Sequence, residues 1–165
     1  MFTTSYAFVG PIEFKKKCEQ SDAIVRGVVV DIVVVAKDIK DSRGSDQKIL
    51  EGEWTGPGSV AIVRVVSVLK GDIKSIGTII LVPCGYSFDE SPCELTKSKD
   101  YILFLESMGH NYYHPIHPFG MHRVQKDMVG MSGFDWEGDF DPKAQNGKAI
   151  TLEEFTKRIV DAKKK

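Results

Sequence analysis

The sequence has few cysteines, little net charge and no long apolar run. Its 165 residues include three cysteines, too few for a disulfide-dense miniprotein. With 22 basic and 23 acidic residues the formal net charge is −1, so the chain lacks the charge signature of a nucleic-acid-binding domain. No apolar run reaches the roughly 18 residues that a membrane span needs. These absences argue against a disulfide-dense miniprotein, a nucleic-acid-binding domain and a membrane-spanning protein, and they favour a globular domain.

The common motifs of catalysis are missing as well. The sequence has no Gly-x-Ser-x-Gly elbow for a nucleophilic serine and no Cys-x-x-Cys pair for structural zinc. Gly56-Pro57-Gly58 has no Lys-Ser/Thr after it, so it is a turn and not a phosphate loop. The acidic run from Asp135 to Asp141 lacks the ligand spacing of a calcium-binding EF-hand loop. We therefore expect no enzyme activity and no cofactor.

The histidines are the strongest candidates for chemistry, because all four fall in one stretch. Imidazole is a common zinc or copper ligand, but the prolines beside His114 and His117 prevent the helical geometry of an H-E-x-x-H site. We expect a structural loop here and no metal. Metal binding through the cluster remains an alternative, with these candidate ligands: His110, His114, His117 and His122.

The length suits one domain, which we place at residues 11–165, with residues 1–10 as an N-terminal extension. Pro11 to Gln20 has the composition of a short helix, with proline at its first position. Runs of β-branched residues predict strands, and Gly27 marks a bulge or bend within the first of them. Five such runs are separated by turn signals, which is typical of a small barrel or sandwich: Ala23–Val35, Ser59–Leu69, Gly77–Val82, Asp100–Glu106 and Gly120–Val124. The expected core is Ile24, Val28, Val30, Ile62, Val65, Val68, Ile80, Val82, Ile102 and Phe104.

The chain ends in an expected amphipathic helix at residues 151–164. Thr151 and Glu154 have the spacing of a capping box, with Thr151 as the N-cap. An apolar stripe follows at helical spacing: Leu152, Phe155, Ile159 and Ala162. The stripe is expected to pack on the chain's own strands. The alternative is that part of it stays exposed and docks on a helix of a partner protein.

Three motifs carry a resemblance to a known family. They are the stretch from Ser21 to Gly27 (SDAIVRG), Leu69-Lys70-Gly71, and Tyr101-Ile102-Leu103-Phe104. Their order over residues 12–105 resembles the netrin-like module, an OB-type barrel shared by tissue inhibitors of metalloproteinases, netrins, complement proteins and agrin. The resemblance implies a mostly β fold: a five-stranded OB-type barrel with a short N-terminal helix and the C-terminal helix.

Within that family the laminin-binding N-terminal domain of agrin looks nearest. The resemblance implies a secreted, non-catalytic module that docks on a matrix glycoprotein or coiled coil, and it points to a contact face on the terminal helix: Leu152, Phe155, Ile159 and Val160. Residues 1–10 do not form a recognisable signal peptide, so a secreted protein would already have lost its signal. Neither nucleic acid nor a membrane span is expected.

The departures from the family also matter. Metalloproteinase inhibitors of this family chelate the enzyme's zinc through a Cys-x-Cys start, which this chain lacks. Inhibition of a protease through other loops, such as Asp38 to Gly58, remains an alternative. Family members often bridge a cysteine at the position of Cys93, which implies a disulfide from Cys93 to Cys84 or to Cys18.

Overall fold

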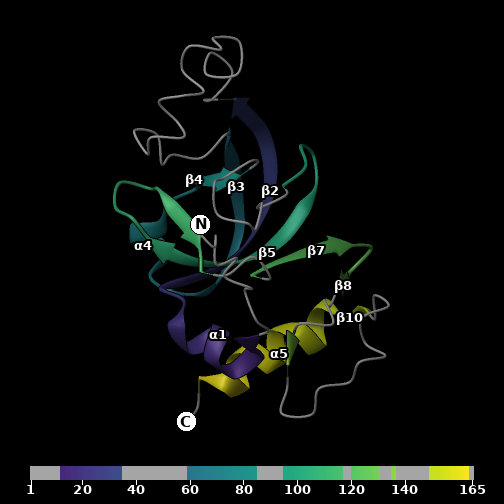
Figure 1. Ribbon diagram of the computed structural model, residues 1–165. Coiled ribbons are helices and arrows are strands. Elements are labelled where there is room, and N and C mark those ends of the chain that lie inside the picture. The colour runs from purple at the N-terminus through teal and green to yellow at the C-terminus, as the bar shows by residue number, and fades with distance from the viewer. Residues whose placement is uncertain are drawn as a thin grey trace, which may run out of the picture.

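β-Strands dominate the computed structural model, which describes residues 12–34, 59–84, 95–116, 120–130, 135–136 and 149–163 (Figure 1). The described helices are α1 (Phe14–Gln20), α4 (Ile73–Ile76) and α5 (Leu152–Ala162). The described strands are β1 (Ile12–Glu13), β2 (Ala23–Val34), β3 (Ser59–Lys70), β4 (Ile79–Cys84), β5 (Asp100–Ser107), β6 (Tyr113–Pro115), β7 (Met121–Gln125), β8 (Met128–Gly130), β9 (Asp135–Trp136) and β10 (Ala149–Thr151).

The expectation of a mostly β fold with a helix near each end is confirmed. All five predicted strands are present, as β2, β3, β4, β5 and β7. Helix α1 begins at Phe14, and Pro11 lies outside the described residues. The capping prediction for α5 is also confirmed, because the side chain of Thr151 accepts a hydrogen bond from the backbone N–H of Glu154 at 3.1 Å.

The main sheet is larger than predicted. It has eight strands in the order β10-β8-β7-β5-β2-β3-β4, and β6 pairs with β5 beside this path. Within the sheet every pairing of named strands is antiparallel. The strand pairs of the described residues do not close into a barrel, because β10 and β4 end the order at opposite sides. The closed five-stranded version of the prediction is therefore corrected to a larger, open sheet.

The two central strands, β2 and β5, bury residues on both faces. Alternate residues of a strand point to opposite faces. Ala23 and Val25 of β2 therefore lie in one apolar cluster, whereas Ile24 lies in the other. We call the first cluster the inner core; its buried members are Ala23, Val25, Val29, Ala61, Val63, Ile76, Ile80, Val82, Cys84, Leu95, Tyr101, Leu103, Leu105 and Tyr113. The second is the helix-side core; its buried members are Phe14, Cys18, Ile24, Ile102, Phe104, Val124, Val129, Phe155 and Ile159.

Helices α1 and α5 lie side by side against one end of the sheet (Figure 1). Phe14 of α1 and Phe155 of α5 meet edge to face with ring centroids 5.3 Å apart. Both rings also contact Phe104 of β5, at 5.9 Å and 6.3 Å. Edge-to-face aromatic pairs add about 0.5–1.5 kcal/mol each beyond the area they bury. This aromatic triangle joins both helices to the central strand.

The first of the three motifs that resemble the netrin-like family, Ser21 to Gly27, supplies contacts that fix the start of β2. The Ser21 hydroxyl donates to the Lys17 carbonyl at 2.8 Å at the end of α1. The Asp22 carboxylate accepts from the Ser107 backbone N–H at 2.9 Å. The guanidinium of Arg26 donates twice to the Asp100 carboxylate, at 2.7 Å and 3.0 Å. These polar residues of the motif therefore fix strand pairing and helix position.

Lys70, in the second motif, closes the C-terminal end of α1. Its ammonium donates to the backbone carbonyls of Cys18, Glu19 and Ser21 at 2.8, 3.1 and 2.6 Å. The last carbonyls of a helix have no partner within the helix and carry partial negative charge, so the ammonium satisfies them and ties α1 to β3. Gly71 follows with a φ of +104°, which favours glycine.

The predicted core is correct in part. Ile24, Ile80, Val82, Ile102 and Phe104 are buried as expected. The prediction is wrong for Val30, which is 38% exposed, and it missed several fully buried residues: Val25, Val29, Ala61 and Val63. The register of β2 against β3 shifts between Ile24/Val25, Arg26/Gly27 and Val29/Asp31. Ala23, Val25 and Val29 keep a regular alternation into the inner core through the first two shifts, and Ile32 packs against that core after the third, which leaves Val30 as the extra residue.

Replacing Gly27 by alanine is expected to destabilise the domain. A Cβ at Gly27 would lie 2.5 Å from Cγ1 of Val63 and 3.1 Å from the Arg64 carbonyl oxygen. Overpacking of this kind costs about 1–3 kcal/mol. Gly130→Ala is the matched control, because its Cβ would meet only the Arg123 carbonyl at 3.7 Å. Urea unfolding measures both variants, and equal free energies of unfolding would contradict the close approach at Gly27.

Candidate functional site

Only part of the predicted contact face on α5 is accessible, because two of its four residues are buried in the core. Phe155 and Ile159 are 0% exposed in the helix-side core, so neither can meet a partner of the folded domain. Leu152 is half-buried, and Val160 is 42% exposed. The accessible residues of the predicted face are therefore Leu152 and Val160. Thr156, which was not predicted, lies between them in a row at the same four-residue spacing beside the buried stripe.

An open groove of about 640 Å³ lies at the start of this row. The β7–β8 turn supplies Lys126 and Asp127, the start of β8 supplies Met128, and α5 supplies Leu152, Glu153 and Thr156. Met128 is 38% exposed. The groove therefore has apolar surface between charged groups of both signs, which suits an amphipathic peptide segment.

The turn that borders this groove has a fixed backbone. Gln125 pairs with Met128, so Lys126 and Asp127 form a two-residue hairpin turn. Their φ values of +50° and +58° are those of a type I′ turn. The backbone N–H of Leu152 donates to the Asp127 carbonyl at 2.8 Å, which fastens the start of α5 to the turn. Both walls of the groove are thus positioned by backbone contacts.

A buried polar pair, missed by the sequence analysis, lies between α1 and β7. The Lys17 ammonium is 2.8 Å from Nε2 of His122, and Nδ1 of His122 is 3.0 Å from the Gly130 carbonyl oxygen. A carbonyl only accepts, so Nδ1 carries a proton, and a neutral ring then accepts from Lys17 at Nε2. The ammonium also lies 4.8 Å from the centre of the Phe104 ring, within the range of a cation–π contact.

The four histidines do not form one site among the described residues. His122 is buried with both ring nitrogens engaged. His114 is exposed on β6, with Nδ1 2.7 Å from the Pro115 carbonyl oxygen, and His110 is exposed on the turn before β6. His117 lies outside the described residues. Within the described ranges, no group of three His, Cys, Asp or Glu side chains is placed to hold a metal ion.

The two predicted disulfides stay predictions, because both include Cys93. Cys18 and Cys84 are both buried free thiols, and they lie in different clusters, the helix-side core and the inner core. Cys93 lies outside the described residues. Burial raises the pKa of the Cys18 thiol from its ordinary value of 9.0 to about 11, against the lowering effect of Lys17, Lys70 and Lys163. Burial also raises the pKa of Cys84.

Comparison with protein-family models and with curated protein sequences finds no match to this chain. The Asp38 to Gly58 segment of the protease-inhibitor alternative lies outside the described residues, as does most of the acidic run after Asp135.

None of the described helices is long and apolar enough to cross a membrane.

Alkylation at pH 8 is expected to spare Cys18 in the folded protein. A thiol with a pKa of about 11 has about a hundredfold less thiolate at this pH than one with a pKa of 9.0, and the thiolate is the reactive form. Iodoacetamide labelling followed by peptide mass spectrometry measures the rate, with protein in guanidinium chloride as the control. Native labelling at the denatured rate would contradict the buried position.

The raised pKa of Cys18 also sets the direction in which the stability of the folded protein changes with pH. The folded state holds the Cys18 proton more tightly than the unfolded chain, so this contribution to stability is present below pH 9 and is lost as the pH rises towards 11.

Lys17→Ala is expected to be far more destabilising than Lys16→Ala on the same helix. Lys17 is 0% exposed, so truncation leaves a cavity and removes the donor to Nε2 of His122, at a cost of about 2–4 kcal/mol. Lys16 is exposed, and its truncation should change stability by less than about 0.5 kcal/mol.

Lys17→Met separates the effect of the cavity from the effect of the lost donor to His122, because methionine keeps most of the buried stem while removing the charge. We expect its cost to fall between those of the two alanine variants. Urea unfolding measures all three, and a Lys17→Ala variant as stable as Lys16→Ala would contradict the buried pair.

Proposed function

We propose that the protein is a secreted, non-catalytic binding module that docks on an amphipathic helix of an extracellular coiled coil, as in a laminin-like matrix glycoprotein. The observation that carries the proposal is the open groove between the β7–β8 turn and α5. It lies on the helix to which the resemblance points, and Leu152 belongs both to the groove and to the expected contact face.

The netrin-like, OB-type interpretation is part of this proposal and depends on the sequence motifs, while the described sheet is open and one bridge is compatible with a partly open barrel. Pairs run from β5 to β2, β3 and β4 in turn. A single parallel bridge between Leu81 of β4 and Tyr112 then leads to β6, which pairs with β5 again. The Leu81 N–H donates to the Asn111 carbonyl at 2.8 Å beside this bridge. An OB-type barrel is itself partly open, so one bridge in place of a full strand pair is consistent with that family.

The charges around the groove favour a coiled-coil helix as the occupant. Met128 and Leu152 give apolar contacts, and Lys126, Asp127 and Glu153 place both signs of charge beside them. A coiled-coil helix carries an apolar seam flanked by Glu and Lys positions, which complements this arrangement. The row from Leu152 to Val160 continues the contact along α5. Large apolar anchors of this kind supply most of the energy of such interfaces.

The proposal predicts that a charged side chain introduced at the contact surface abolishes binding without unfolding the domain. Met128→Glu and Val160→Glu are the test variants, because both residues are exposed, at 38% and 42%. Each should weaken binding by at least about tenfold, the loss expected for an interface anchor. The probe is a laminin coiled-coil fragment, and calorimetry gives the dissociation constant.

Val66→Glu on β3 is the matched control, because Val66 is 52% exposed and does not line the groove. It adds the same charge and should leave binding unchanged. Equal affinities for the control and both groove variants, with unfolding midpoints unaltered, would reject the groove as the binding surface.

A further inference from the structure

The part of the main sheet formed by β2, β3 and β4 has aliphatic side chains on both of its faces. Val29, Val63 and Ile80 pair across these three strands and belong to the inner core. Successive residues of a strand point to opposite faces of the sheet. The residues that flank these three along each strand therefore lie on the opposite surface, which we call the outer face.

The strand register arranges the outer face in two rows. The first row is Val28, Arg64 and Ile79, and the second is Asp31, Ile62 and Leu81. Directly paired residues point to the same side of a sheet, so each row has two aliphatic side chains and one charged side chain. The positive charge is at the centre of the first row, and the negative charge is at the β2 end of the second.

The helices of the helix-side core do not reach these two rows. Helices α1 and α5 lie below β2, β3 and β4 in Figure 1, and no residue of the two rows belongs to either core cluster. Ile79 is 39% exposed, while Val28, Ile62 and Leu81 are half-buried. The outward positions of a sheet that faces water are polar as a rule. Aliphatic side chains at four of these positions therefore indicate a surface that another molecule covers.

The two charged residues of the outer face indicate the chemistry of that molecule. The guanidinium of Arg64 is exposed and has no hydrogen-bond or ion-pair partner among the described residues. Oδ1 of Asp31 accepts from the Lys97 ammonium at 2.7 Å. An ionised carboxylate has about four acceptor sites, so Asp31 can also accept from a guanidinium. The occupant should therefore offer a carboxylate to Arg64 and a cation to Asp31, within an apolar surface.

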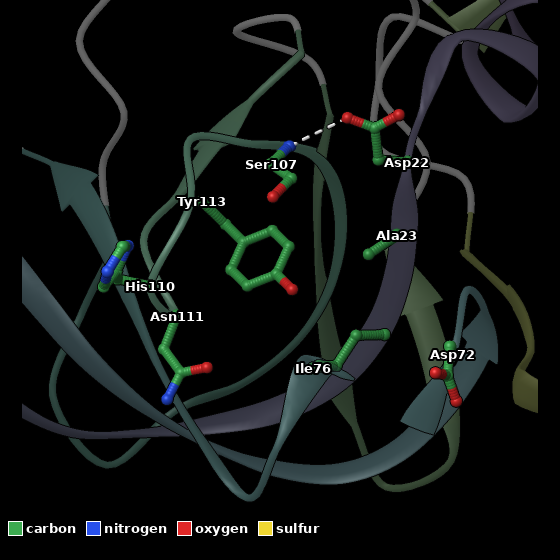
Figure 2. Close-up of a pocket in the computed structure, with 8 residues that line it drawn as sticks. All are labelled: Asp22, Ala23, Asp72, Ile76, Ser107, His110, Asn111 and Tyr113. Atoms are coloured by element: carbon green, nitrogen blue, oxygen red, sulfur yellow. Dashed lines mark hydrogen bonds between the residues drawn. The ribbon is translucent and has the colours of Figure 1, made fainter. Parts of the chain in front are cut away.

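The cavity shown in Figure 2 is not part of the outer face. Its volume is about 350 Å³, and its wall includes Ala23, Ile76 and Tyr113 of the inner core. No residue of the two rows lines this cavity or the groove on α5. The occupant of the outer face must therefore fit the surface of a sheet. A second sheet does so, because stacked sheets pack about 10 Å apart with interdigitating side chains.

We propose that two copies of this chain associate as a dimer, outer face against outer face. A two-fold axis across the strands, midway between the rows, places the first row of each copy opposite the second row of the other. Ile79 then lies opposite the partner's Leu81. Arg64 lies opposite the partner's Ile62, and the partner's Asp31 is on the next strand, about 4.8 Å to the side. The two-fold symmetry forms each of these contacts twice, so the face supplies both charges that it needs.

The size of the outer face predicts a weak, reversible dimer. Three strands about 4.8 Å apart and the six residues of β4 define a patch of about 14 by 20 Å. A patch of this size is at the small end of specific interfaces, so we expect a dissociation constant on the order of 100 µM. The dimer does not use the groove on α5, and failure of either proposal leaves the other intact.

Sedimentation equilibrium from about 10 µM to about 1 mM tests the dimer. The unmodified protein should change from monomer to dimer over this range. Ile79→Glu should abolish the change, because it places a charge in the apolar part of the interface. Met108→Glu is the matched control, since Met108 is 61% exposed on the turn between β5 and β6, and it should dimerise like the unmodified protein. A monomer at all concentrations, or undiminished association of Ile79→Glu, would overturn the proposal.

A charge exchange tests the two-fold arrangement. Arg64→Asp and Asp31→Arg each bring like charges together across the interface, so each should weaken association at least about tenfold. The double variant restores opposite charges and should recover to within about threefold of the unmodified protein. Lys97→Ala is the control for the ion pair that Asp31 makes within its own chain, and it should keep association within about threefold. A double variant as weak as the weaker single variant would overturn the proposal.

Discussion

Burial of β2 and β5 on both faces is the constraint on which the rest of the structure depends. Ile24 and Val25 are adjacent and both fully buried, as are Leu103 and Phe104. A sheet with two apolar faces must be covered twice. The curvature of the sheet and α4 enclose the inner core, while α1 and α5 cover the other face. The short helices at the ends of the described chain are therefore required by the sheet and are not appendages to it.

Polar contacts fix the positions of α1 and α5 on the sheet. Lys70 reaches the last carbonyls of α1 from β3, and Lys163 donates from the end of α5 to the Leu69 carbonyl on the same strand. Lys17 reaches from α1 to His122 on β7, inside the aromatic triangle. Apolar packing alone has little directional preference. Three lysines in defined hydrogen bonds therefore fix the position of each helix on the sheet.

The positions of the helices and strands could be predicted from the sequence much better than which of their residues are buried. The β-branched runs and the Thr151 cap are local signals, and the corresponding strands and helix are present. The inward face of β2 could not be predicted, because burial on both sides removes the apolar–polar alternation and one extra residue, Val30, interrupts it. Strands as short as β6 and β8 depend on their partners and leave no periodic pattern. Lys17 did leave a signal: it follows Phe14 by three positions and precedes Cys18, which places it on the buried face of α1.

The residues of the resembling motifs differ in their contacts from the residues that border the proposed binding groove. The polar residues of the resembling motifs, from Ser21 to Lys70, are engaged in backbone and strand contacts, so the resemblance bears on fold more than on partner. The groove is instead bordered by a turn with left-handed backbone, at Lys126 and Asp127. Non-glycine residues adopt this conformation at a cost, and they keep it only where surrounding contacts enforce it. The rigid sheet supplies those contacts, so this surface turn can hold recognition groups in fixed positions while its sequence remains free to change the ligand.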